Sequence, residues 1–107
     1  MDPELAAESF AAMGATTRLD VVRNLVRAGE RGLTVGEIKD RTGLPASTLA
    51  HHLKALSLAG LIVQERKGRE IISRANYAHL QRLAGFILEE CCVDAGSIAP
   101  LTEDETV

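Results

Sequence analysis

The sequence contains little that would mark a secreted or membrane protein. Its only two cysteines, Cys91 and Cys92, are adjacent, so they are not the disulfide framework of a small secreted domain. No apolar run approaches the roughly 20 residues that span a bilayer. The acidic start MDPELAAESF lacks the apolar stretch of a secretory signal. We therefore expect a cytoplasmic protein without a membrane partner.

Catalytic arrangements are also missing. We find no nucleophile, base and orienting group at recognisable spacing, and no glycine-rich phosphate loop. Adjacent thiols occur in redox catalysis, but here they have no such catalytic arrangement around them in the sequence. We therefore expect a protein that is not an enzyme and has no catalytic cofactor. Its 107 residues suffice for one core. We predict one domain over residues 1–95 and a flexible acidic tail over 96–107.

Charge is divided unevenly along the chain. The net charge is −3, but residues 15–75 carry eleven Lys and Arg against six Asp and Glu, a balance of +5, and the two ends together carry −8. A basic middle is compatible with a nucleic-acid surface on that part alone. Ordinary scatter of surface charge remains the alternative.

Apolar periodicity predicts five helices and one β-hairpin. The helices are expected over about 4–13, 16–28, 34–42, 46–59 and 77–92, and the hairpin over 61–74. In the second helix, the residues expected to face inward are Leu19, Val22, Leu25 and Val26.

The third helix has clear end signals. Thr34 followed by Glu37 predicts a capping box, and Gly43 is expected to end the helix. Pro45 suits the first turn of the next helix. The order of elements, mainly α with a small β-hairpin (α-α-α-α-β-β-α), predicts a winged helix-turn-helix. Residues 34–42 and 46–59 form the helix-turn-helix, and the hairpin is the wing.

The fourth helix has the two faces that a DNA-recognition helix needs. Leu49, Leu53 and Leu56 form an inward stripe, and polar residues lie on the other side. We predict that the outer residues contact double-stranded DNA; they are Ser47, Thr48, His51 and Lys54. For the first two, helix capping is the alternative.

His51 and His52 raise the alternative of a metal site. Neighbouring helical residues point about 100° apart, so they do not easily share one ion. We expect His51 to face DNA and His52 to be partly buried. At the hairpin tip, Arg66, Lys67 and Arg69 are predicted to reach a phosphate or the minor groove, unless they are simply solvated.

The sequence resembles the ArsR/SmtB family of small dimeric winged-helix repressors over about residues 5–92. The resemblance rests on ATTRLDVVRNLV, on LPASTLAHHLKALSLAGLIVQERKGREI and on the helix after the hairpin. It implies a homodimer built from the first and last helices that binds an imperfect inverted repeat and releases it when an effector binds. MarR-like regulators also contain winged helices, but with longer flanking helices. A winged helix that binds only protein partners is a further alternative.

Known effector sites of the family fit this sequence unequally. The arsenite site on the third helix needs cysteines, and residues 34–42 contain none. A zinc site on the last helix would here involve Tyr77, His79, Glu90 and Val93. Two of those four residues are not suitable ligands, so His79 is expected to be a surface or interface histidine.

The adjacent cysteines resemble those of an arsenite-responsive subgroup with a cysteine pair at the end of the last helix. That subgroup usually has a third cysteine downstream, where this chain has VDAGSIAP, with Ser97. The resemblance implies Cys91 and Cys92 as ligands of arsenite or antimonite, which acts as the inducer. The third ligand is then not a cysteine of the same chain.

Physical chemistry leaves other uses of the cysteine pair open. Adjacent Cα atoms lie about 3.8 Å apart, below the roughly 4.4 Å at which disulfides begin, so a bond between these two would be strained. Soft thiolates suit trivalent arsenic or antimony. The alternatives are packing at a dimer interface, a redox or persulfide switch, and a zinc or cadmium site shared by two chains. Glu89, Glu90 and Asp94 are expected to raise the thiol pKa and reduce redox reactivity.

Overall fold

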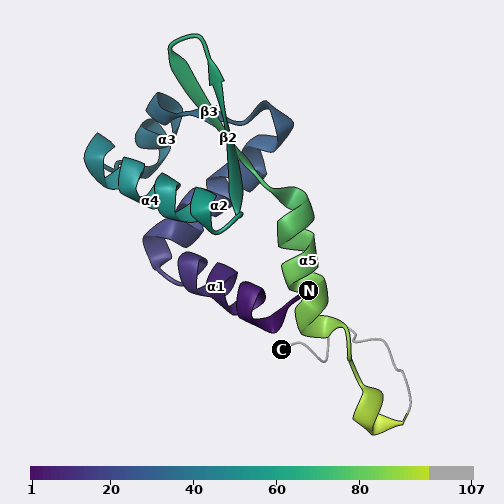
Figure 1. Ribbon diagram of the computed structural model, residues 1–107. Coiled ribbons are helices and arrows are strands. Elements are labelled where there is room, and N and C mark those ends of the chain that lie inside the picture. The colour runs from purple at the N-terminus through teal and green to yellow at the C-terminus, as the bar shows by residue number, and fades with distance from the viewer. Residues whose placement is uncertain (97–107) are drawn as a thin grey trace.

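The computed structural model describes residues 1–96 and confirms the winged helix-turn-helix (Figure 1). The α-helices are α1 (Pro3–Met13), α2 (Thr16–Ala28), α3 (Val35–Thr42), α4 (Ala46–Leu58) and α5 (Tyr77–Leu88), with short 3-10 turns η1 (Gly29–Arg31) and η2 (Val93–Ala95). The strands are β1 (Leu33–Thr34), β2 (Ile62–Lys67) and β3 (Glu70–Ala75). From residue 97 onward, the predicted acidic tail lies outside the described residues, so the division at residue 95 stays a prediction.

The predicted signals at the ends of α3 are confirmed. Thr34 Oγ1 accepts a hydrogen bond from Glu37 N at 3.1 Å, and Glu37 Oε1 accepts one from Thr34 N at 2.9 Å. Gly43 ends the helix with φ 73°, a left-handed conformation that glycine adopts without strain. Pro45 differs slightly from the prediction, since it occupies the N-cap of α4 and not its first turn.

The hairpin is part of a three-stranded antiparallel sheet in the order β1-β3-β2. Strand β1 was not predicted, because two residues are too few to show an alternating pattern. Leu33 pairs with Ser73, and Thr34 pairs with Ile72. Gly32 permits this pairing, since a Cβ there would lie 2.6 Å from the Ser73 carbonyl oxygen. The strand anchors the start of α3 to the wing.

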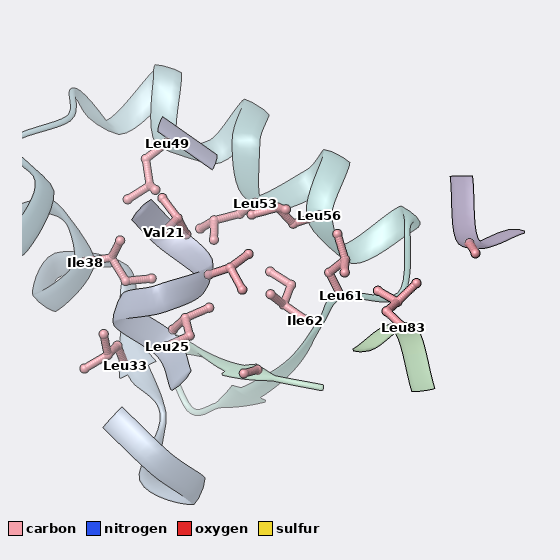
Figure 2. Packing of buried hydrophobic residues seen from close by; sticks show 13 residues of the cluster. Val21, Leu25, Leu33, Ile38, Leu49, Leu53, Leu56, Leu61, Ile62 and Leu83 are labelled. Atoms are coloured by element: carbon pink, nitrogen blue, oxygen red, sulfur yellow. The ribbon is translucent and has the colours of Figure 1, made fainter. Parts of the chain in front are cut away.

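The core lies where α2, α3, α4 and the sheet meet. Figure 2 shows Leu49, Leu53 and Leu56 of α4 among the packed side chains, as predicted. The inward face of α2 is different from the prediction: Leu19 and Val26 are 46% and 43% exposed. The buried residues of α2 are Val21, Val22 and Leu25. Val22 and Leu25 are buried as predicted, but apolar periodicity wrongly included Leu19 and Val26 and missed Val21, because α2 has apolar residues on both sides.

The last helix is shorter than predicted. α5 ends at Leu88 and is followed by a turn, so Cys91 and Cys92 lie beyond the helix. Glu89 and Glu90 follow directly, and the last helical turn contains no basic residue. Acidic groups at the negative end of a helix dipole are unfavourable, which is a physical reason for the helix to stop there.

The hairpin and α1 lie on opposite sides of α4, and α5 runs from the sheet past the start of α1 towards the yellow-green η2 turn at the far end from the hairpin (Figure 1). Within residues 1–96, none of the helices has the length and apolar character required to cross a membrane.

Candidate nucleic-acid interface and cysteine pair

The turn between α3 and α4 is held by local hydrogen bonds. Thr42 Oγ1 donates to the Ile38 carbonyl at 2.8 Å and accepts from Leu44 N at 3.3 Å. Ile38 and Leu49 are both fully buried, which fixes the two helices against the core. The angle between the helices of the helix-turn-helix is therefore set by packing as well as by the turn.

The four predicted residues on the outer face of α4 are all exposed; they are Ser47, Thr48, His51 and Lys54. No side chain caps the start of α4, where Pro45 is the N-cap. The alternative that Ser47 and Thr48 serve as helix caps therefore finds no support. Their hydroxyl groups are available to an external acceptor or donor.

His52 has the structural role that was predicted. It is half-buried, and its Nδ1 accepts a hydrogen bond from Arg18 Nε at 3.0 Å. Burial lowers the pKa of His52, and the nearby charges of Arg18 and His51 lower it further. The neutral ring that accepts this bond ties α4 to α2. Arg18 was not recognised from the sequence, because the contact joins residues 34 positions apart.

A metal site at His51 and His52 gains no support. The two ring centroids lie 5.9 Å apart and the rings are tilted by 55°. Among the described residues, no group of three or more His, Cys, Asp or Glu side chains is placed to hold a metal ion.

The three predicted cations of the hairpin are exposed; they are Arg66, Lys67 and Arg69. Of these, Lys67 approaches Glu65 at 4.0 Å, a weak contact between exposed side chains. Gly68 turns the chain between the strands with φ 62°. The structure therefore presents these cations at one end of the hairpin.

Arg74 stiffens the base of the hairpin and was not singled out in the sequence. Its Nη1 lies 2.8 Å from Glu65 Oε1, and its Nε donates to the Glu30 carbonyl at 2.6 Å. The hydrogen bond and charge of Arg74, together with the charge of Lys67, lower the pKa of Glu65. The hairpin register was the missing signal, because Arg74 pairs with Val63, two residues from Glu65.

Helices α1 and α5 leave apolar side chains exposed. Leu5 and Phe10 on α1 are 45% and 36% exposed, and Ile87 and Leu88 at the end of α5 are 63% and 59% exposed. Large apolar side chains left exposed on these two helices are candidates for a protein–protein contact surface. We call these four residues the α1/α5 apolar face.

His79 is buried within the chain, so the expectation of a surface or interface histidine was wrong. It is 8% exposed, and its Nε2 lies 2.8 Å from the Oγ of the fully buried Ser9. Ser9 Oγ also lies 3.4 Å from the Ala59 carbonyl at the end of α4. Asn76 Nδ2 donates to the Gly60 carbonyl at 2.9 Å, while its Oδ1 accepts from His79 N at 3.3 Å. We call these five residues the α1–α4–α5 junction.

The zinc site considered from the sequence is not formed within the chain. The Tyr77 hydroxyl lies 3.3 Å from the carbonyl oxygens of both Leu25 and Val26, so it contacts α2. His79 contacts Ser9 in the interior. Neither Tyr77 nor His79 is therefore placed to bind a metal ion together with Glu90.

The two thiols lie close together in the turn after α5. Cys91 is exposed and Cys92 is half-buried, and neither forms a disulfide. Their Sγ atoms are 3.0 Å apart. Cys91 N donates to the Leu88 carbonyl at 2.9 Å, and Cys92 has φ 66°, a left-handed conformation that is uncommon for a residue with a side chain. The turn therefore holds the two sulfur atoms next to each other.

The pKa of Cys92 is raised, in the direction expected from the sequence, but mainly for another reason. The hydrogen bond with the Cys91 thiol is the largest cause, followed by partial burial and the charge of Cys91. The hydrogen bond between the two thiols therefore disfavours loss of the Cys92 proton.

Comparisons with known proteins identify relatives of the chain. A family model described as a helix-turn-helix domain matches residues 13–65. The HTH-type transcriptional repressor SmtB of Mycobacterium tuberculosis is 34% identical over 80 residues, which cover 75% of this chain and 57% of SmtB. This chain thus spans little more than half the length of that relative. An uncharacterised HTH-type transcriptional regulator of Methanocaldococcus jannaschii is 37% identical over 65 residues, covering 61% of this chain and 71% of the relative.

Solved structures agree with these relatives. An ArsR-like transcriptional regulator from Rhodococcus superposes with a TM-score of 0.71 at 29% identity, over 87% of this chain and 84% of that one. The homodimeric winged helix-turn-helix DNA-binding domain of a Mycobacterium bovis protein superposes with a TM-score of 0.62 at 25% identity, over 82% of each chain. By these matches and by the order of its helices and strands, the chain belongs to the ArsR/SmtB family of winged helix-turn-helix transcriptional regulators.

Proposed function

We propose that this protein is a cytoplasmic, homodimeric transcriptional repressor that releases its DNA operator when trivalent arsenic or antimony binds Cys91 and Cys92. The observation that carries the proposal is the pair of Sγ atoms 3.0 Å apart in an accessible turn, joined through α5 to a winged helix-turn-helix. Family membership supports the regulatory role, and supports it over an enzymatic one.

DNA binding is assigned to the outer face of α4 and the hairpin tip. Ser47, Thr48, His51 and Lys54 are directed to the major groove, where hydroxyl, imidazole and ammonium groups can contact phosphates and base edges. Arg66, Lys67 and Arg69 contact the flanking backbone or minor groove. A homodimer places two such surfaces on an inverted repeat.

The α1/α5 apolar face is the proposed dimer contact. Its four exposed apolar side chains would be covered by the same face of a second copy. The homodimeric relative from Mycobacterium bovis supports the same assembly. The cysteine turn follows directly after Ile87 and Leu88, so a ligand there lies beside the proposed dimer contact.

Trivalent arsenic and antimony suit this turn better than the other candidates. They are soft and thiophilic, and two neighbouring sulfurs can bind one such centre while losing their protons. The third ligand then comes from solvent, from a small thiol or from the partner chain. Zinc would require four ligands, so both chains would have to contribute two thiolates each. The raised pKa of Cys92 reduces the thiolate fraction that a redox switch needs.

We expect ligand binding at the cysteine pair to affect DNA binding through the relative positions of α5 and α4. A ligand that changes how the two α5 helices approach each other would also act on the α1–α4–α5 junction, which holds the end of α4. A coupling free energy of about 1–3 kcal/mol is enough to weaken operator binding by about 5- to 150-fold.

The DNA surface is tested by the salt dependence of binding. The duplex is the region upstream of the protein's own gene, and the variants are Arg66→Gln, Lys67→Gln and Arg69→Gln, singly and together. Each lost phosphate contact should reduce the slope of log K against log salt by about one. Arg82→Gln, an exposed cation on α5, is the control and should leave the slope unchanged. An unchanged slope and affinity in the triple variant would show that the wing does not contact DNA.

The inducer is tested by titrating the protein–DNA complex with arsenite, antimonite, zinc, cadmium and an oxidant in parallel. Release at the lowest concentration by arsenite or antimonite is the expected result. Release by zinc or cadmium alone would indicate a metal site shared between two chains. Release by the oxidant alone would indicate a thiol switch.

A further inference from the structure

A hollow of about 300 Å³ lies between α4 and the sheet, and it shares only Lys54 with the proposed DNA surface. Its walls include Leu53 and Leu58 from α4 and Ile71 from β3. Leu58 is 80% exposed, the highest value among the large apolar side chains of the described residues. The volume is at the lower end of the range of about 300–1,000 Å³ that small-molecule pockets occupy.

The polar groups of this hollow favour an anion. Lys54 supplies a positive charge at the rim, and none of the eight lining residues is acidic. Lys54 forms no ion pair within residues 1–96. Ser57 adds a hydroxyl group. Gln64 points its amide nitrogen away, to Ser73 Oγ at 3.1 Å.

We infer that the hollow binds a small amphipathic carboxylate. The carboxylate pairs with Lys54 and accepts a hydrogen bond from Ser57, while the hydrocarbon part covers Leu53, Leu58 and Ile71. DNA is a poor match for this site, because phosphates and sugars offer no apolar surface of that size. The charge complementarity at Lys54 and the acid-free lining select the carboxylate over a neutral apolar molecule.

Such a ligand would oppose DNA binding directly. Lys54 is one of the cations assigned to DNA, and a bound carboxylate neutralises it. A second hollow shares Val35 and Ile71 with the first and is lined by both Arg69 and Glu70 of the hairpin. The carboxylate therefore lies beside Lys54 and next to the part of the hairpin that carries Arg69. This route of release is independent of Cys91 and Cys92.

Binding is tested on the full chain without DNA or arsenic, by calorimetry and by backbone amide NMR. Sodium octanoate is the probe, with octan-1-ol as the uncharged comparator and acetate as the comparator without a chain. Octanoate should bind saturably, with its largest NMR shifts at Ala50, Lys54, Ser57, Leu58 and Ile71. The alcohol and acetate should each bind at least about tenfold more weakly than octanoate. Shifts centred elsewhere, or equal binding of octanol and octanoate, would overturn the inference.

Matched variants separate the site from general apolar binding. Leu58→Asn should weaken octanoate binding by about fivefold, because an apolar wall is lost. Val63→Asn is the control, since Val63 is exposed on β2 but does not line the hollow, and its affinity should equal that of the wild type. Lys54→Gln should remove the preference for octanoate over octanol. An unchanged affinity in Leu58→Asn would contradict the site, and the amide spectrum of each variant shows that it is folded.

A last comparison links the site to DNA. Octanoate at about its dissociation constant for the wild type should weaken DNA binding by the wild type clearly more than DNA binding by Leu58→Asn. Because the calorimetry uses neither DNA nor arsenite, a failure there would leave the proposed repressor function standing. Conversely, loss of the arsenite response would not affect octanoate binding.

Discussion

Ser9 Oγ and His79 Nε2 lie 2.8 Å apart in the interior, joining α1 to the start of α5. Ser9 is fully buried, and its hydroxyl also approaches the Ala59 carbonyl at the end of α4. One hydroxyl proton cannot serve both acceptors at once. A proton on His79 Nε2 therefore satisfies the arrangement best, with histidine donating to serine and serine donating to the carbonyl. This chain of bonds connects the proposed dimer helices to the recognition helix.

Ser9→Ala should destabilise the protein by about 1–3 kcal/mol, because it leaves His79 Nε2 buried without a partner. Urea unfolding at one fixed protein concentration measures the change, since a dimer's stability depends on concentration. Ser47→Ala removes an exposed hydroxyl and should change stability by less than about 0.5 kcal/mol. A Ser9→Ala variant as stable as Ser47→Ala would show that the buried bond is not important.

Glu65 should give the hairpin a stability that depends on pH. Its pKa is lowered from the ordinary value of 4.5, first by the hydrogen bond with Arg74. A lowered folded-state pKa means that the contribution is present above the unfolded-state pKa and is lost as pH falls through the folded-state value.

Glu65→Gln should therefore be less stable than the wild type at pH 7, and the difference should shrink as pH falls below about 4.5. Urea midpoints at a series of pH values measure it. Glu8→Gln, on the exposed surface of α1, should have a midpoint near that of the wild type at pH 7. A Glu65→Gln difference that grew on acidification would have the wrong sign for this ion pair.

Ile87→Glu should dissociate the proposed dimer. The change removes one apolar side chain from each of two α1/α5 faces and adds two like charges, which should weaken association by about 100-fold or more. Sedimentation at several concentrations measures the dissociation constant. Val63→Glu places the same charge on the sheet and should leave the dimer intact. Equal dissociation constants for the two variants would exclude this face as the dimer contact.

The sequence predicted those parts of the fold whose signals are local. The capping box of Thr34 and Glu37 lies within one helical turn, and the leucines of α4 repeat at helical spacing on a single face. The hairpin has β-branched residues in both strands, on either side of the turn at Gly68. Each of these features is determined mainly by neighbouring residues, and each was found.

Features that depend on distant residues were missed. Strand β1 exists because Leu33 pairs with Ser73, forty positions away. His79 is buried because Ser9 lies seventy positions earlier in the chain. The cysteine pair was recognised as a candidate site because the two thiols are adjacent in the sequence. Its position in a turn beyond α5 could not be predicted, because it depends on where that helix ends. The roles assigned to Ser47, Thr48, His51 and the hairpin cations stay predictions until DNA binding is measured.

The central claim is that Cys91 and Cys92 receive the inducer and control DNA binding from the end of α5. The most direct measurement is arsenite titration of the protein–DNA complex for the wild type and for the double variant Cys91→Ser with Cys92→Ser. The double variant should dimerise and bind DNA as the wild type does, because both side chains lie outside the core, but it should no longer release DNA when arsenite is added. Release of the double variant at the same arsenite concentration as the wild type would contradict the claim.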